Sequence, residues 1–228
     1  MKTLVIIPAR GGSKGIPHKN IKDFGGKPLI YYTIDCARTV CADADICVST
    51  DDVEIIKCVE DYGLKVPFVR PAELASDTAG TYEVLLHAVD FYEKQGRQYD
   101  NVLLLQNTSP FRTADDVKEA MNLYRSDIDM VVSVKEIVSP YYNCFEETKD
   151  GFLRQISNGT RYTRRQDAPR TFEYNGALYL INTESLKRCS MGDFTRCVKY
   201  VMDDNRSVDL DTLLDWRYAE FLLKEKIV

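Results

Sequence analysis

Short apolar runs alternate with segments of helical periodicity along most of the chain. The runs have the length of strands, and most are apolar throughout, which is typical of strands covered on both faces. We predict strands over residues 3–8, 45–50, 65–69, 101–106, 130–134, 176–181 and 196–202.

The segments between these runs carry apolar residues at helical spacing and end in helix start and stop signals. Pro28 suits a first turn, Asp52 and Thr113 suit N-caps, and Gly63 and Gly96 suit helix ends. We predict helices over residues 28–40, 52–62, 81–94, 113–125 and 212–226.

This alternation of strand and helix predicts an α/β fold, a mostly parallel sheet with helices on both faces. Ligands of such sheets bind beyond the carboxyl ends of the strands. The segments to examine are therefore residues 8–20, 49–52, 70–81, 106–112 and 203–211.

Between about residues 136 and 175 the alternation stops. Short aromatic segments, a turn signal at Asp150 and Gly151, and a basic stretch at 161–167 take its place. We interpret this part as an excursion from the sheet, so residues 1–228 are expected to form a single domain.

The composition of the chain excludes several classes of function. The chain has 228 residues, 44% hydrophobic and 29% charged, which is ordinary for a globular protein. A net charge of −5 argues against general nucleic-acid binding, and no apolar stretch approaches the roughly 20 residues of a membrane span. Seven cysteines without a CxxC pair indicate a reducing, cytoplasmic setting, and two histidines leave little material for a histidine-based site.

The segment after the first strand has the composition of a triphosphate-binding loop. Residues 8–20 contain three glycines, an arginine and two lysines, which would bring backbone N–H groups and cations to an anion. The spacing fits neither a P-loop nor a dinucleotide fingerprint. The alternative is a flexible basic surface loop.

Two further segments carry polar groups suited to a ligand. Gln106, Thr108 and Ser109 follow an apolar strand, where they could bind a hydroxylated ligand or simply form a turn. Asp209 and Asp211 share one side of an extended segment, and such a pair favours Mg²⁺ completed by water and substrate phosphate. The alternative for Asp211 is an N-cap of the last helix.

Two signals near the end of the excursion are less specific. Residues 164–170 form a cationic cluster that is either a solvated surface or a closure over an anionic ligand. Asn175 and Gly176 are by default a turn.

Together these segments resemble the acylneuraminate cytidylyltransferase family, the CMP-sialic acid synthetases and their nonulosonic-acid relatives. The resemblance covers nearly the whole chain in order. It comprises I-P-A-R-G-G-S-K-G-I-P-x-K-N-I (7–21), V-S-T-D (48–51), R-P-A-E-L-A-S-D-T-A (70–79), L-L-Q-N-T-S-P-F-R-T (104–113), R-R-Q-D-A-P (164–169), Y-N-G-A-L-Y (174–179) and V-D-L-D-T-x-x-D (208–215).

The resemblance implies a Rossmann-like nucleotidyltransferase fold and a homodimer formed through an arm at about 136–175. It implies that CTP and a nonulosonic acid give a CMP-sugar and pyrophosphate, with Mg²⁺ as cofactor and without nucleic-acid or membrane partners. It assigns the nucleotide to Ala9, Arg10, Gly11, Ser13, Lys19, Asn20, Arg70 and Thr81. It assigns the sugar to Gln106, Thr108, Ser109, Asn175 and Arg165, the last reaching across the dimer, and Mg²⁺ to Asp209 and Asp211.

Catalysis would rest on Lys19, Arg10 and Asp211, so we expect the first loop and the two aspartates to meet in one cleft. Kdo cytidylyltransferases share the fold and the reaction and are the alternative family. Ser139 to Tyr142 and Glu173 differ from sialate-specific members, which leaves legionaminate, pseudaminate or a deaminated analogue open as acceptor. A non-catalytic nucleotide-binding protein of the same fold is the alternative from another class.

Overall fold

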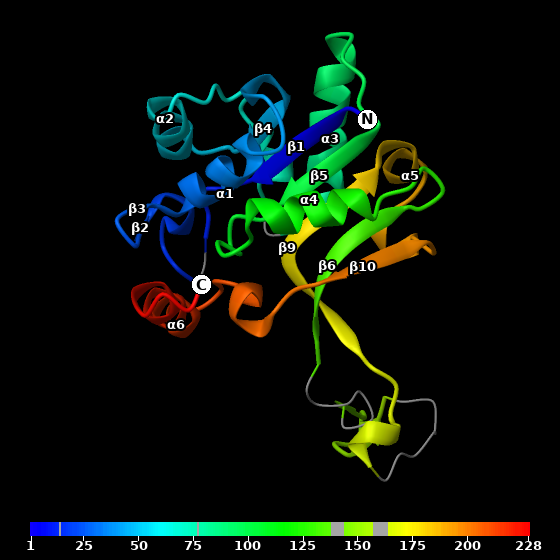
Figure 1. Ribbon diagram of the computed structural model, residues 1–228. Helices are drawn as coiled ribbons and strands as arrows, with labels where there is room; N and C mark the ends of the chain where they lie inside the picture. Colours follow the sequence, from blue (N-terminus) through cyan, green and yellow to red (C-terminus); the bar gives the residue numbers. More distant parts are fainter. Residues whose placement is uncertain (14, 77, 138–143, 157–163) are drawn as a thin grey trace.

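The computed structural model describes residues 1–13, 15–76, 78–137, 144–156 and 164–228. Its main sheet has the strand order β10-β6-β9-β5-β1-β4 (Figure 1). Among these strands β9 alone is antiparallel to its neighbours, and the predicted mostly parallel sheet is confirmed. The strands are β1 (Thr3–Pro8), β4 (Ile46–Ser49), β5 (Asn101–Leu105), β6 (Met130–Glu136), β9 (Phe172–Asn182) and β10 (Cys197–Val201).

Helices cover both faces of this sheet. On one face α1 (Leu29–Arg38), α2 (Val53–Asp61) and α4 (Ala114–Asn122) pack in one apolar core. On the other face α3 (Thr81–Lys94) and α5 (Thr183–Arg188) pack in a second core. A third cluster joins α6 (Leu213–Lys224) to the first loop and the hairpin of β2 (Asp23–Phe24) and β3 (Lys27–Pro28).

Side-chain caps set the helix starts. The Asp52 carboxylate accepts from the first turn of α2, as predicted. Thr113 forms a capping box with Asp116 at the start of α4. At α6 the N-cap is Thr212 rather than Asp211, so the capping alternative for Asp211 is wrong and its carboxylate remains available to a ligand.

Two predicted elements differ from the structure. Residues 65–69, all described, form only an isolated bridge between Thr50 and Val69. Pro67 lies in the middle of that run and has no N–H to donate to a ladder, which explains the loss. The predicted strand at 176–181 begins earlier, at Phe172, and its turn signal lies inside β9.

The segment expected to leave the sheet does so. β6 and β9 continue past the sheet into an arm that carries the hairpin of β7 (Phe145–Glu147) and β8 (Leu153–Gln155) (Figure 1). The aromatic residues Tyr141 and Tyr142 and the basic residues 161–163 lie outside the described residues. Within the part of the chain that is described, no helix is both long and apolar enough to cross a membrane.

Candidate active site

Two adjoining cavities open where β1 and β5 end. Their volumes are about 420 Å³ and about 290 Å³, and residues of the first loop line both. The residues common to the two are Pro8, Arg10, Asn20, Thr108 and Asp211. The cavities therefore form one cleft at the carboxyl ends of the strands, as the fold class leads us to expect.

The first loop meets the aspartate segment in this cleft. Lys19 is buried, and its Nζ donates to the carbonyl oxygen of Leu210 at 2.6 Å. The same Nζ lies 3.4 Å from Asp211 Oδ1. The predicted meeting of these segments, 192 residues apart, is confirmed.

The backbone of the first loop is used differently from the prediction. The N–H of Ala9 donates to Ser49 O at 2.9 Å, and that of Gly11 donates to Asp51 Oδ1 at 3.1 Å. Neither residue lines the cleft. A β-carbon at Gly11 would lie 2.3 Å from Asp52 Oδ2, so this glycine allows the loop to pack on the start of α2. The residues of this loop that line the smaller cavity and carry side chains suited to an anion are Arg10, Ser13 and Lys19.

At the other end of the cleft lie Arg70 and the start of α3. The Arg70 guanidinium is buried and donates to Ser49 Oγ at 3.0 Å and to the Ser49 carbonyl oxygen. Burial lowers the pKa of Arg70 below its usual value. Gly80 and Thr81 place the N-terminus of α3 at this wall, beside the apolar side chains of Leu74 and Val84.

Two buried amides connect the first loop to the segment after β5. Asn20 Nδ2 donates to the carbonyl oxygen of Arg10 at 2.9 Å, and Asn20 Oδ1 accepts from Asn107 Nδ2 at 2.9 Å. This relay fixes the amide orientation of Asn20 and holds the first loop against the end of β5. The sequence analysis did not single out Asn107, although it lies between Gln106 and Thr108 in a run of polar residues.

Asp209 and Asp211 both line the larger cavity. Burial is the largest influence and raises the pKa of Asp209, with a further increase from Asp211, while Thr108 and Lys19 act in the opposite direction. Asp209 Oδ1 is buried and has no hydrogen-bond partner among the described residues. A divalent cation would satisfy both features, so the aspartates fit Mg²⁺.

The described residues contain no cluster of three or more His, Cys, Asp or Glu side chains suited to a metal. Two carboxylates completed by water and substrate phosphate are, however, a common way to hold Mg²⁺. The geometry therefore agrees with a cation that binds together with a nucleotide.

The residues predicted to contact a sugar divide into two groups. Gln106 and Thr108 line the larger cavity. Ser109 is fully buried, and its hydroxyl donates to the carbonyl oxygen of Asn175 at 3.4 Å.

Asn175 is buried and turned away from the cleft. Its Oδ1 accepts from Ser133 Oγ at 2.6 Å, and its Nδ2 donates to Ser207 Oγ at 2.9 Å. These bonds use its amide inside the protein, so the structure gives Asn175 a supporting position in place of the predicted ligand contact. The next residue, Gly176, has φ of +76°, and a β-carbon there would lie 2.8 Å from Gln106 Oε1.

A buried arginine supports the segment after β5. Arg112 Nη1 donates to the carbonyl oxygens of Gln106 at 2.7 Å, Ser109 at 2.8 Å and Ala177 at 3.0 Å. Sequence reasoning treated Arg112 only as part of a motif, since nothing local distinguishes a buried arginine from a surface one.

Arg165 lies in the arm, within the short helical turn Arg165–Asp167. Figure 1 shows that the arm extends away from the sheet. The backbone of this turn therefore lies apart from the strand ends at which the cleft opens.

Comparison with known proteins agrees with these features. Residues 4–194 match the family described as cytidylyltransferase. The pseudaminic acid cytidylyltransferase of Campylobacter jejuni is 32% identical over 98% of this chain and 97% of its own length. The N-acylneuraminate cytidylyltransferase of Streptococcus agalactiae is 36% identical over 99% of this chain, which spans 56% of that longer protein.

Among solved structures, a CMP:2-keto-3-deoxy-manno-octonic acid synthetase complexed with CTP has a similar fold. Its TM-score is 0.73 at 19% identity, over 99% of this chain and 100% of that one. The likeness confirms the Rossmann-like architecture. On the family match over most of its length and the two relatives above 30% identity, the chain belongs to the cytidylyltransferase family.

Proposed function

We propose that this chain transfers CMP from CTP to a nonulosonic acid in a Mg²⁺-dependent reaction that releases pyrophosphate. The observation that carries the proposal is the contact of Lys19 with the segment of Asp209 and Asp211 in a cleft that Arg10 also lines. Cations for a triphosphate and carboxylates for a divalent cation thus face one space. The relatives named for pseudaminic and N-acylneuraminic acid, matched over 98% and 99% of this chain, support the substrate class.

In this reaction the anomeric hydroxyl oxygen of the sugar bonds to the α-phosphorus of CTP. The bond between the α-phosphorus and the bridging oxygen breaks, pyrophosphate leaves with that electron pair, and the hydroxyl proton is released. Such chemistry needs positioning and charge neutralisation more than covalent help from the protein. When bound, Mg²⁺ would neutralise phosphate charge and assist the leaving group.

The residues take their roles from their places in the cleft. Arg10, Ser13 and Lys19 line the smaller cavity and would hold the triphosphate. Arg70 and Thr81 line the far end of the larger cavity, where the cytidine would lie near Asn20. Gln106 and Thr108 would face the sugar, and Asp209 and Asp211 would hold Mg²⁺.

We also propose that the active form is a cytoplasmic homodimer. The arm carries exposed apolar side chains, among them Phe145, Phe152 and Leu153, as expected of a surface that a second copy covers. Arg165 on this arm would then reach the cleft of the partner. All seven cysteines are free thiols, which a reducing compartment maintains.

The test is pyrophosphate release by the purified chain with CTP, Mg²⁺ and a panel of acceptors. The panel comprises neuraminate, legionaminate, pseudaminate, the deaminated sugar and Kdo. We expect turnover only when all three components are present, with a nonulosonic acid preferred over Kdo. Preference for Kdo would reassign the substrate, and CTP binding measured by calorimetry without turnover would indicate a non-catalytic nucleotide-binding protein.

The dimer has a separate test by subunit complementation. Arg165→Ala and Asp211→Asn should each be inactive alone. A mixed dimer combines Asp211 of one subunit with Arg165 of the other in one complete site, so co-expression should restore about a quarter of the wild-type activity. Recovery of no activity, with mixed dimers shown to form, would place Arg165 outside the partner's site.

A further inference from the structure

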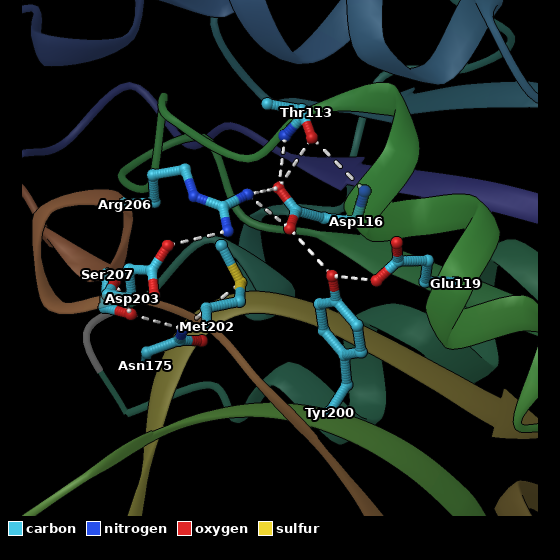
Figure 2. Close-up of polar contacts among 9 residues, drawn as sticks. All are labelled: Thr113, Asp116, Glu119, Asn175, Tyr200, Met202, Asp203, Arg206 and Ser207. Atoms are coloured by element: carbon cyan, nitrogen blue, oxygen red, sulfur yellow. Dashed lines mark hydrogen bonds and ion pairs between the residues drawn. The ribbon is translucent and has the colours of Figure 1, made fainter. Parts of the chain in front are cut away.

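A buried carboxylate on α4, that of Asp116, accepts several of the hydrogen bonds drawn in Figure 2. Asp116 is 1% exposed, and Arg206 Nη1 lies 2.6 Å from its Oδ1 and 2.7 Å from its Oδ2. The Oδ2 also accepts from Thr113 N at 2.7 Å and Thr113 Oγ1 at 2.8 Å, and Tyr200 Oη lies 2.9 Å from Oδ1. Arg206 and Thr113 donate to this one charge, and Tyr200 shares its single hydroxyl proton between Asp116 and Glu119 Oε2, which also lies 2.9 Å away. The carboxylate of Asp116 is therefore well satisfied.

This ion pair joins the two segments that line the acceptor side of the cleft. Thr113 directly follows the segment of Gln106 and Thr108, whose backbone is held through the neighbouring Arg112. Arg206 lies three residues before Asp209 on the chain. The Asp116–Arg206 pair therefore links the start of α4, where one of these segments ends, to the loop that carries both aspartates.

Other bonds hold the same loop from two further sides. Ser207, next to Arg206, accepts from Asn175 Nδ2 at 2.9 Å and donates to the carbonyl oxygen of Asp203 at 2.8 Å (Figure 2). Farther on, the Leu210 N–H donates to the carbonyl oxygen of Thr108 at 2.9 Å. Lys19 holds the far end of this loop through Leu210, and Arg206 holds its near end. The partner of Arg206 is a buried charge that cannot be left unpaired without a large penalty.

We propose that the Asp116–Arg206 ion pair is a positioning device that sets Asp209 and Asp211 relative to Gln106 and Thr108. The inference rests on the proposed function, because that function supplies the two ligands, the cation and the acceptor, that the ion pair would align. Neither Asp116 nor Arg206 lines the cleft, so both act through the segments they join. A loss of the pair should impair cation binding and turnover while CTP binding changes little.

A matched control lies at the opposite ends of the strands. Asp129 precedes β6, is buried, and accepts from Arg188 Nη2 at 2.8 Å and from Ser185 Oγ at 2.7 Å. This pair anchors loops in the same way, but it joins no residue of the cleft. Its arginine is more exposed than Arg206, at 65% against 29% of the side chain, but its aspartate is equally a buried charge. Arg188→Lys therefore measures what weakening an arginine's hold on a buried aspartate does to stability alone.

The experiment compares Arg206→Lys with Arg188→Lys, both of which keep the positive charge and change its geometry. Thermal unfolding, kcat, the KM for CTP and the Mg²⁺ concentration for half-maximal rate are measured for each. For Arg206→Lys we expect kcat to fall about 10- to 100-fold and the Mg²⁺ requirement to rise about 10-fold, with the KM for CTP within about threefold. For Arg188→Lys we expect a smaller loss of melting temperature, because its side chain is more exposed, with kcat within about twofold.

A readout independent of turnover is calorimetric titration of Mn²⁺ in the presence of a non-hydrolysable CTP analogue. Weaker Mn²⁺ binding by Arg206→Lys than by Arg188→Lys supports the proposal, and equal binding and equal kcat overturn it. If Arg206→Lys does not fold, Tyr200→Phe removes one neutral donor to Asp116 and should show the same pattern at about threefold, whereas wild-type behaviour overturns it. A wild-type chain that converts no sugar would refute the proposed function, and the Mn²⁺ titration would still decide the positioning role.

Discussion

Replacing Gly15 by alanine tests whether the first loop and the aspartate segment must stay in contact. A β-carbon at Gly15 would lie 2.0 Å from the carbonyl oxygen of Asp211, and β-carbons essentially never come within 3.0 Å of such an atom. The obstacle is backbone on both sides, so no side chain can turn aside. Gly15→Ala therefore forces the two segments about 1 Å apart.

This displacement determines how large a loss of kcat we expect. Misplacing reacting groups by about 1 Å costs on the order of 100-fold in rate, which corresponds to about 2.7 kcal/mol in the transition state. Lys19 and Asp211 would separate together with the two backbones. The contact lies at the surface of the cleft, so the free energy of unfolding should fall by less than the barrier rises.

Gly12→Ala is the matched control, because a β-carbon at Gly12 meets no atom within 4 Å. Both variants stiffen the same loop by one methyl group. Pyrophosphate release at saturating CTP and acceptor, with melting temperatures measured in parallel, compares them. If Gly15→Ala keeps kcat within about threefold of Gly12→Ala, close contact between loop and aspartates is not needed and the reasoning fails.

Other substitutions should separate stability from activity. Asn175→Ala removes the buried hydrogen bonds of its amide with Ser133, Ser207 and the N–H of Ala177, and should lower the free energy of unfolding by about 2–3 kcal/mol, seen as a melting temperature lower by about 4–12 °C. Asp209→Asn should abolish Mg²⁺-dependent turnover yet raise the melting temperature at pH 7. Because the folded-state pKa of Asp209 is raised, its carboxylate destabilises the fold once the pH exceeds about 4. The gain in melting temperature should therefore vanish in acid, and a lower melting temperature of the variant at pH 7 would contradict this reasoning. The reverse holds for Asp116: burial alone would raise its pKa, but hydrogen bonds from Thr113, Tyr200 and Arg206 lower it. The stability that this carboxylate adds at neutral pH should be lost as the pH falls below about 4. The melting temperature of Asp116→Asn should therefore fall less steeply with decreasing pH than that of the wild type.

Local patterns predicted most of the fold because burial and chain periodicity are local properties. Helix α3 begins and ends at the predicted residues, Thr81 and Lys94, and β1 has the predicted bounds. One failure is local, because Pro67 lies within the run itself and prevents a ladder there. The other comes from information that is not local, because β9 owes its early start to pairing with β6 at the base of the arm.

The cleft was predictable in part for the same reason. Lys19 and Asp211 carry chemistry that their neighbours in sequence reveal, and their contact follows from the carboxyl ends of a parallel sheet. The backbone N–H groups of Ala9 and Gly11 were misassigned, because only the folded chain shows that Ser49 and Asp51 accept from them. The supporting residues Asn107, Arg112 and Arg206 were missed, since hydrogen bonds to distant segments leave no pattern in sequence.

Strand β9 connects the arm to the cleft. Its eleven residues run from Phe172 in the arm to Asn182 in the middle of the sheet, and its register against β6 shifts around Gly176, where φ is +76°. At this irregularity Gly176 packs against Gln106, Ser109 and Asp209. If a second copy binds the arm, as proposed above, any displacement of the arm would reach the residues around Gly176, so the association of subunits and the shape of the cleft would be coupled.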